Sequence, residues 1–292
     1  DDEVLGYLKA FIPRLDSQWE EPVALYEAES LDELAQAAEV LPLPYLGFCA
    51  SGRRFGAKGA RALASSPALT HLQVLGLGEA WIKEGIESLA SSPELRNLEV
   101  LELASNFIGD EGARALAESP SLERLRFLDL QNNKIGNDGV KALAASPLSR
   151  RLWSLDLDYN KIGDEGFEVL AVGLSSGNLR TFELGANRLG DKGVEAGVAK
   201  LTEENGLREL SLGGNRIGDR GARALAGTPH LSKLEKLSLE SNRIGDAGAR
   251  ALLESPYLGE LRLLYLHNNR IGDEVLGELR AMCEGRSLEL VV

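Results

Sequence analysis

The chain has 292 residues, of which 43% are apolar and 26% are charged, and its formal net charge is −13 at pH 7. The apolar fraction is enough for a continuous core, yet no apolar run approaches the ~18 residues of a membrane-spanning helix. The strong negative charge disfavours nucleic acid as a partner, because a polyanion would be repelled.

The first 42 residues carry most of the negative charge. They hold 11 acidic and 2 basic residues, whereas residues 43–292 hold 34 acidic and 30 basic residues. Apolar positions from Val4 to Ile12, and a capping-box pattern at Ser30–Glu33, predict two amphipathic helices. We interpret residues 1–42 as a helical, acidic N-terminal cap that covers the first unit of the following domain. The alternative is a separate helical module that docks onto a partner.

In residues 43–292, one asparagine returns at a nearly fixed interval. Successive members are separated by 27 or 28 residues, and a constant period of this size indicates a stack of similar supersecondary units. Arg53 and Ala80 occupy the asparagine position in the first two units, which are degenerate as terminal units often are. The recurring residues, called the ladder asparagines below, are Asn106, Asn133, Asn160, Asn187, Asn215, Asn242 and Asn269.

The residues before each ladder asparagine predict a short strand. In one unit, Leu101 and Leu103 alternate at period two, which is typical of a strand with its apolar side inward. The chain must then turn at Asn106, and an asparagine amide can satisfy backbone groups that no apolar residue could. Stacked units are therefore expected to align these buried amides in a ladder.

The residues after the asparagine predict a helix. Asp110 is expected to cap that helix with its carboxylate. Gly112 and Ala113 begin a stripe of small residues that would let the helix approach the strands closely. Ser119–Pro120 ends the helix, because proline offers no backbone donor. With one strand and one helix per unit, we expect strands on a concave side and helices on a convex side, because a helix is wider than the strand spacing.

The pattern Leu-x-x-Leu-x-Leu-x-x-Asn-x-Ile-Gly-Asp-x-Gly resembles leucine-rich repeats of the ribonuclease-inhibitor-like class. The motif Gly-Ala-Arg-Ala-Leu-Ala, followed by Ser-Pro, is similar to repeats common in bacterial proteins. The resemblance covers residues 43–292, as about nine repeats and a C-terminal cap strand within 287–292. It implies an α/β fold, a right-handed solenoid or horseshoe, and a non-enzymatic scaffold that binds a partner protein.

The residue four positions before each ladder asparagine lies between two strand leucines and is expected to face solvent on the concave side. Four successive members are acidic, namely Glu102, Asp129, Asp156 and Glu183, and adjacent parallel strands would place them about 5 Å apart. Asp158 lies beside this row and adds to its charge. We hypothesise that the row binds a partner protein with a basic surface. The alternatives are a solubilising role or a divalent cation such as Ca²⁺.

Apolar positions are predicted on both sides of the acidic row. Val74 and Val100 precede it and Leu263 follows it, each two positions earlier in its strand. Exposed apolar patches with a polar surround often mark interaction sites, and aromatic residues are common anchors there. The candidate partner contacts are Phe127, Trp153, Tyr159, Tyr265 and His267.

No motif predicts catalysis, a metal or a cofactor. His71 and His230 have no nucleophile beside them, and neither a phosphate-binding Gly-x-x-x-x-Gly-Lys-[Ser/Thr] loop nor cysteine–histidine metal spacing occurs. We therefore expect no enzymatic activity, no metal and no cofactor. Fold-level analogy leaves two alternatives open: an activator-like regulator of a small GTPase, and the substrate-recognition part of a larger enzyme.

We expect a cytoplasmic protein. No signal peptide is visible, although the chain begins at Asp1 rather than methionine, which is compatible with a trimmed segment. Cys49 and Cys283 lie near opposite ends of the stack, which disfavours an intrachain disulfide.

Overall fold

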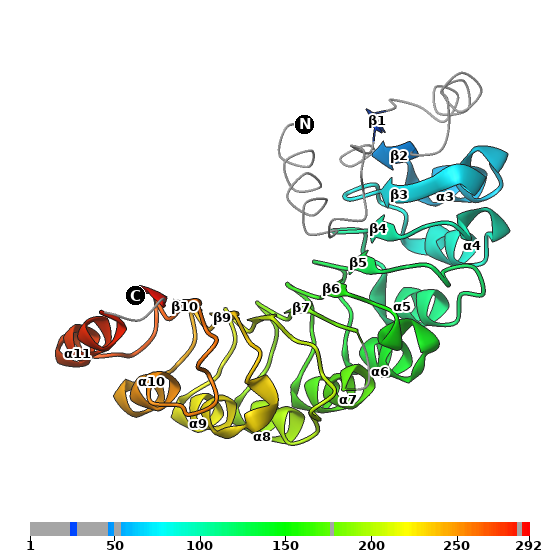
Figure 1. The fold of residues 1–292 in the computed structure, drawn as a ribbon. Coiled ribbons are helices and arrows are strands. Elements are labelled where there is room, and N and C mark those ends of the chain that lie inside the picture. Colours follow the sequence, from blue (N-terminus) through cyan, green and yellow to red (C-terminus); the bar gives the residue numbers. More distant parts are fainter. Residues whose placement is uncertain (1–23, 28–45, 50–53, 176–177, 285–287) are drawn as a thin grey trace.

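The computed structural model describes residues 24–27, 46–49, 54–175, 178–284 and 288–292. In this part of the chain, eleven parallel strands form one sheet in which each strand pairs with the next one in sequence. The strands line the inner side of an open arc and the helices cover its outer side (Figure 1). The expected α/β solenoid, with strands on the concave face and helices on the convex face, is confirmed.

Most strands are only three residues long, and most helices span two to three turns. The strands are β1 (Ala24–Glu27), β2 (Leu46–Cys49), β3 (Leu72–Gly76), β4 (Val100–Glu102), β5 (Phe127–Asp129), β6 (Ser154–Asp156), β7 (Thr181–Glu183), β8 (Glu209–Ser211), β9 (Lys236–Ser238), β10 (Leu263–Tyr265) and β11 (Glu289–Val291). The helices are α3 (Gly56–Ala64), α4 (Ile86–Ala90), α5 (Gly109–Ala117), α6 (Asn137–Ala145), α7 (Asp164–Leu174), α8 (Asp191–Val198), α9 (Asp219–Gly227), α10 (Asp246–Leu253) and α11 (Asp273–Cys283).

Both ends of the sheet extend the repeats. Strand β1 lies within the segment interpreted as a cap and pairs in parallel with β2, so the sheet begins before residue 43. The helices predicted around residues 4–12 and 31–40 lie outside the described residues, and the division of the chain at residue 42 stays a prediction. At the other end, β11 pairs with β10, and Leu288, Leu290 and Val292 pack against the core.

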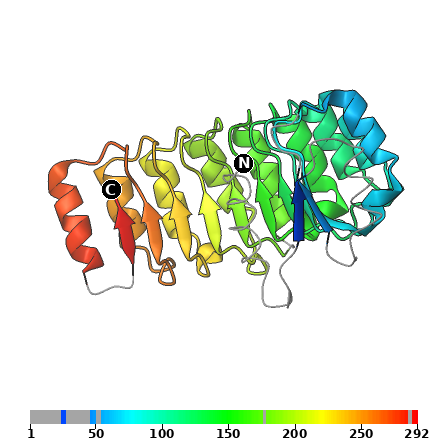
Figure 2. The same ribbon diagram turned by 90° about the horizontal axis from the view of Figure 1, so that it is seen from above.

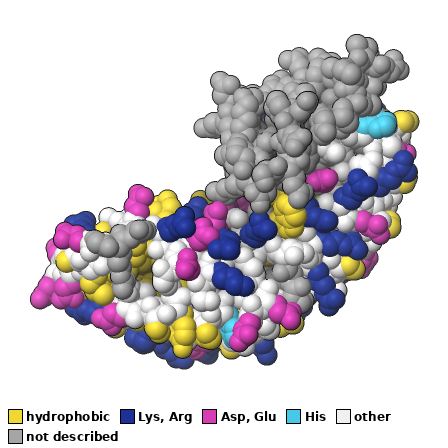
Figure 3. Space-filling view, in the orientation of Figure 1, with side chains coloured by type: hydrophobic (Ala, Val, Ile, Leu, Met, Phe, Trp, Pro, Cys, Tyr) yellow, Lys and Arg dark blue, Asp and Glu magenta, His cyan; other side chains and the backbone are white. Residues whose placement is uncertain are grey.

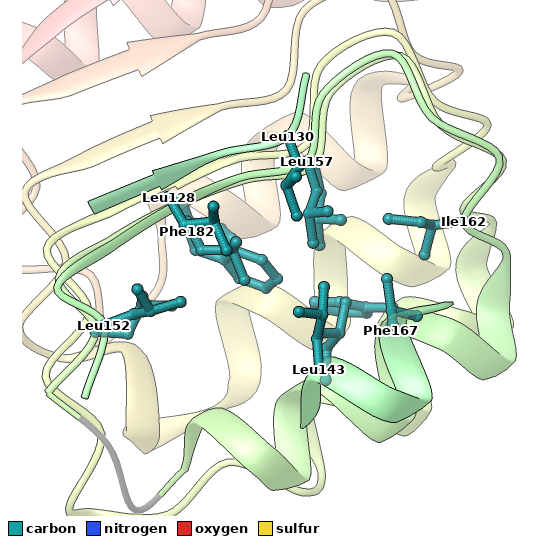
Figure 4. Packing of buried hydrophobic residues seen from close by; sticks show 14 of the residues in the cluster. Leu128, Leu130, Leu143, Leu152, Leu157, Ile162, Phe167 and Phe182 are labelled. Carbon is teal, nitrogen blue, oxygen red and sulfur yellow. The ribbon is translucent and has the colours of Figure 1, made fainter. Parts of the chain in front are cut away.

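The core fills the space between the strand layer and the helices. Leu143 and Phe167 project from α6 and α7 toward Leu157 and Phe182 of the strand side (Figure 4). The rings of Phe167 and Phe182 are stacked with centroids 6.4 Å apart. Because the same positions recur in each repeat, the buried side chains form one continuous cluster along the stack, which gives a single array rather than separate domains.

The ladder asparagines join each repeat to the one before it. Asn160 Oδ1 accepts from the backbone N–H groups of Asn133 and Ile135, at 3.0 and 2.9 Å. Its Nδ2 donates to the carbonyl of Leu130 in the preceding repeat, at 2.9 Å, and to that of Leu157 in its own repeat, at 3.0 Å. Asn160 is 7% exposed, so these bonds are made away from solvent, where an unmade bond is costly.

A second ladder connects the helix starts, and it corrects the expected role of Asp110. This residue does not cap its own helix, because α5 already begins at Gly109. Its Oδ1 instead accepts from the N–H groups of Gly136 and Gly139, at 2.6 and 3.1 Å, at the start of the next helix. The residues that repeat this link to the following helix are Asn137, Asp164, Asp191, Asp219 and Asp246.

The glycine in the first turn of helices α6 to α10 makes room for this link. A Cβ on Gly193 would lie 2.5 Å from Asp164 Oδ1 and 2.6 Å from Asp164 Cα, closer than van der Waals contact permits. The small residue therefore serves the approach of the preceding repeat, rather than the approach of the helix to the strands.

We expect Asn160→Ala to destabilise the fold by about 3–5 kcal/mol, because it leaves several buried backbone groups without partners. Thermal and urea unfolding would measure the change. Asn178→Ala is the matched control, since Asn178 is exposed and makes one 3.3 Å side-chain hydrogen bond. Equal stability of the two variants would show that the ladder does not hold the repeats together.

Asp219→Ala is expected to weaken the start of α10, not that of α9, by about 1–2 kcal/mol. Its Oδ1 accepts from Gly245 N at 2.7 Å and Gly248 N at 3.0 Å. Amide hydrogen exchange should accelerate at these two glycines and stay unchanged at Gly218 and Gly221. Asp219→Asn is the control, because Asn137 makes the same link in this chain. Faster exchange in α9 alone would contradict capping across repeats.

Candidate binding surface

The sheet register places the four acidic residues in one row on the concave side. Glu102 pairs with Asp129, Asp129 with Asp156, and Asp156 with Glu183 on successive strands. The row continues in register with Ser211, Ser238 and Tyr265. Identical positions in neighbouring repeats thus hold four carboxyl groups side by side at the strand spacing of about 5 Å.

Three of these four side chains are buried, whereas the alternation along the strands predicts that they face solvent. Glu102, Asp129 and Asp156 are 5%, 5% and 2% exposed. Each carboxylate folds back onto the backbone two residues later: the N–H groups of Ala104, Gln131 and Asp158 donate at 3.0, 2.8 and 2.8 Å. Acidic side chains often form such hydrogen bonds to the nearby backbone. Here these bonds take the place of contacts with water.

The most concentrated negative charge lies at the middle of the row. Asp156, Asp158 and Glu183 bring carboxylate oxygens within 4.8 Å of one another. Asp158 Oδ1 also accepts a hydrogen bond from the Gly185 backbone N–H. Asp158 and Glu183 remain partly exposed, so this acidic cluster, defined as Asp156, Asp158 and Glu183, has one buried and two accessible members.

Burial and mutual repulsion raise the pKa values of two members of the acidic cluster. Burial raises the pKa of Asp156 well above its usual value, and the charges of Asp129, Glu183 and Asp158 raise it further. For Asp158, burial and then the charge of Glu183 raise the pKa from 3.8 to about 7, against the opposing effect of the Gly185 hydrogen bond. These two carboxyl groups therefore hold their protons to higher pH than an isolated aspartate does.

The acidic cluster offers oxygen ligands but not a complete cation shell. Ca²⁺ takes about six to eight oxygen ligands, and the cluster brings together three carboxyl groups. Asp156 and Asp158 also accept backbone hydrogen bonds. Neither a metal nor a cofactor is assigned to this surface.

The apolar patch expected before the acidic row is not exposed. Val74, Val100 and Phe127 are 0%, 5% and 5% exposed, so they contribute to packing rather than to an accessible surface. Phe127 contacts the Trp153 ring edge-on, with centroids 6.0 Å apart. Alternation along a strand indicates the face to which a side chain belongs, but not whether that face is open.

The remaining aromatic candidates are accessible to different degrees. Tyr159 is 61% exposed, directly after the acidic pair Asp156 and Asp158. Tyr265 and His267 are partly exposed and pack edge to face at 6.2 Å near the C-terminal end. Trp153 is partly exposed and lies between two guanidinium groups, with Arg126 at 5.9 Å and Arg180 at 5.6 Å from its ring centroid.

Two glycines outside the predicted set of site residues shape the acidic surface. A Cβ on Gly185 would lie 3.1 Å from the Asp158 carboxylate, and one on Gly213 would lie 2.1 Å from Glu240 Oε1. Both glycines stand two positions before a ladder asparagine, beside a repeat with an acidic residue at that position. The signal that could have identified them is a glycine at the position where the adjacent repeat carries a carboxylate.

The sequence matches the family described as "Leucine Rich repeat" over six segments, residues 94–117, 124–144, 152–171, 176–196, 207–226 and 230–253. Each of the six segments contains one ladder asparagine. This chain is a leucine-rich repeat protein.

Two solved structures are similar to this leucine-rich repeat protein. A chain of the yeast Rad7 and Elc1 complex is 19% identical with a TM-score of 0.50, over 84% of this chain and 69% of that chain. An internalin from Listeria monocytogenes is 20% identical with a TM-score of 0.46, over 90% of this chain and 76% of that chain. No curated protein matches the sequence.

One face of the leucine-rich repeat protein carries charged side chains of both signs. On the face seen in Figure 3, Lys and Arg side chains alternate with Asp and Glu across the repeats. None of the helices in the described part of the chain is both long and apolar enough to cross a bilayer.

The folding stability of the unmodified protein should fall as the pH rises from 5 to 8, and we expect Asp158→Asn to make this fall smaller. The folded-state pKa of about 7 lies above the ordinary 3.8, so the contribution of protonated Asp158 is full below pH ~4 and is lost as the pH rises through ~7. Asparagine keeps an acceptor for Gly185 N–H and carries no charge. The variant should gain about 1–2 kcal/mol at pH 8.

Thermal unfolding across this pH range measures the effect. Glu203→Gln is the control, because it removes one exposed carboxylate from a loop. If both variants follow the same pH profile as the unmodified protein, the acidic cluster does not titrate as described.

Proposed function

We propose that this leucine-rich repeat protein is a non-enzymatic scaffold that binds a partner protein with a basic surface on its concave side. The observation that carries the proposal is the acidic cluster, whose carboxylate oxygens lie within 4.8 Å of one another beside the exposed Tyr159. Negative charge held this closely is unfavourable in the free protein. A lysine or arginine of a partner would relieve it.

The raised pKa values support a basic partner. A positive charge near Asp158 would lower its pKa, because it favours the ionised carboxylate. Binding near pH 7 should therefore release a proton, which calorimetry in buffers of different ionisation enthalpy can detect. The buried Glu102 and Asp129 would add to the negative potential without contacting the partner.

Exposed aromatic residues would supply the apolar part of the contact. Tyr159 is a rigid side chain with an apolar ring and a polar end, the type of residue that often dominates binding energy. Tyr265 and His267 would extend the contact toward the C-terminal repeats, and Trp153 would border it on the side of Arg126 and Arg180.

We expect the combined change Asp158→Asn, Glu183→Gln and Tyr159→Ala to weaken partner binding by about tenfold to a hundredfold. Alanine fits the backbone there, because Ala186 adopts the same left-handed conformation one repeat later. Partners would be captured from a native lysate, identified, purified and titrated at low and high salt.

The matched control is Glu203→Gln, Glu204→Gln and Tyr257→Ala. It removes the same number of charges and one exposed tyrosine away from the concave side. Equal affinity of the two triple variants for each partner would exclude the concave surface as the binding site.

A further inference from the structure

A second charged row runs along the loops that follow the strands. It occupies the position directly after the ladder asparagine, where six successive repeats carry a lysine or an arginine. All six side chains are exposed. The members of this basic row are Lys134, Lys161, Arg188, Arg216, Arg243 and Arg270.

The backbone holds the basic row in regular register. The N–H of Arg188 donates to the Ile162 carbonyl at 2.9 Å, and the N–H of Arg216 donates to the Leu189 carbonyl at 2.8 Å. Parallel bridges link Arg188, Arg216 and Arg270 to the preceding repeats. Consecutive members are thus one sheet spacing, about 5 Å, apart at the backbone. All strands point to the edge that carries these loops (Figure 2).

No member of the basic row forms an ion pair with an acidic residue of the described chain. Basic residues elsewhere on the repeats do, as Arg220 pairs with Glu195 at 2.9 Å and Arg250 with Glu278 at 2.8 Å. The position just before each ladder asparagine is at least partly exposed and is uncharged in the same six repeats. Those residues are Asn132, Tyr159, Ala186, Gly214, Ser241 and Asn268.

The nearest repeated carboxylates are already engaged with the backbone. Asp164, Asp191, Asp219 and Asp246 each accept helix N–H groups of the following repeat, so their charge is directed at the helix starts. The basic row is therefore a line of repelling positive charges on a protein whose net charge is −13. An anionic ligand that extends over several repeats would relieve this repulsion.

The aromatic residues that continue the row distinguish between polyanions. Trp81 and Phe107 occupy the same position in the two preceding repeats and are 50% and 38% exposed. Arg54 lies over the Trp81 ring at 4.7 Å and Lys134 over the Phe107 ring at 4.3 Å. Each cation covers one face of its ring and so reduces the area on which a nucleic-acid base could stack, and the net charge of −13 also disfavours a polynucleotide. The ring edges remain suited to an apolar side chain.

We propose that the basic row is a second binding site, which takes an extended Asp- and Glu-rich segment of a partner protein. The guanidinium groups of four members would bind its carboxylates in paired hydrogen bonds. These members are Arg188, Arg216, Arg243 and Arg270. An apolar residue at one end of the segment would contact Trp81 and Phe107. The site lies on the loop edge and is distinct from the concave acidic cluster.

The test uses the whole protein and a fluorescent 12-residue Glu-rich peptide with a terminal leucine. The row variant replaces Arg188, Arg216, Arg243 and Arg270 by glutamine. The control variant replaces Arg61, Arg114, Arg124 and Arg223, which are also exposed, by glutamine, so both lose the same charge. Circular dichroism melts establish that both are folded.

We expect the row variant to bind the peptide about 10–30-fold more weakly at low salt, with a shallower salt dependence, and the control variant to bind it nearly unchanged. An equal loss of peptide affinity in both variants would show that the effect comes from net charge alone, and would overturn the proposal. Tighter, row-dependent binding of a 12-nucleotide single strand would assign the site to nucleic acid instead. The Glu183→Gln variant separates the two surfaces, because it should keep full peptide affinity.

Discussion

The side-chain amides of the ladder asparagines tie each repeat from Asn106 onward to the repeat before it, and the other features of the molecule are arranged around them. A single strand and helix cannot bury their apolar sides alone, so each repeat depends on the one before it. At Asn160, one side chain satisfies backbone groups of two repeats at once. The aspartates at the helix starts form a second set of links on the convex side, as Asp191 does for Gly218 and Gly221.

Much of the fold could be predicted from the sequence, because repetition multiplies a weak local signal. The period located the strands, the helices and the buried asparagines, and the alternation of Leu101 and Leu103 identified the inner side. The role of Asp110 could not be predicted in the same way. Its hydrogen-bond partners, Gly136 and Gly139, lie 26 and 29 residues away, whereas capping rules describe contacts within one helix start.

The sequence predicted where the acidic residues of the candidate site lie along the sheet, but not how deeply their side chains are buried. The register of Glu102, Asp129, Asp156 and Glu183 follows directly from equal repeat lengths. Burial does not, because a carboxylate that folds onto the backbone two residues later looks the same in sequence as one that faces water. The pKa of Asp158 depends on that environment, since burial is its largest cause.

The ladder also explains how the two charged rows come to lie on separate surfaces. The residue before each asparagine adopts a left-handed backbone, as Tyr159 does at a φ of 55°, which costs of order 1 kcal/mol for a bulky side chain. The hydrogen bonds of the neighbouring asparagine offset this cost and turn the chain out of the sheet. Residues before the turn, such as Asp156, face the concave side, and residues after it, such as Arg188, face the loop edge. Opposite charges at a fixed offset in sequence therefore become two parallel rows that do not neutralise each other, a geometry that suits a scaffold with two oppositely charged partners.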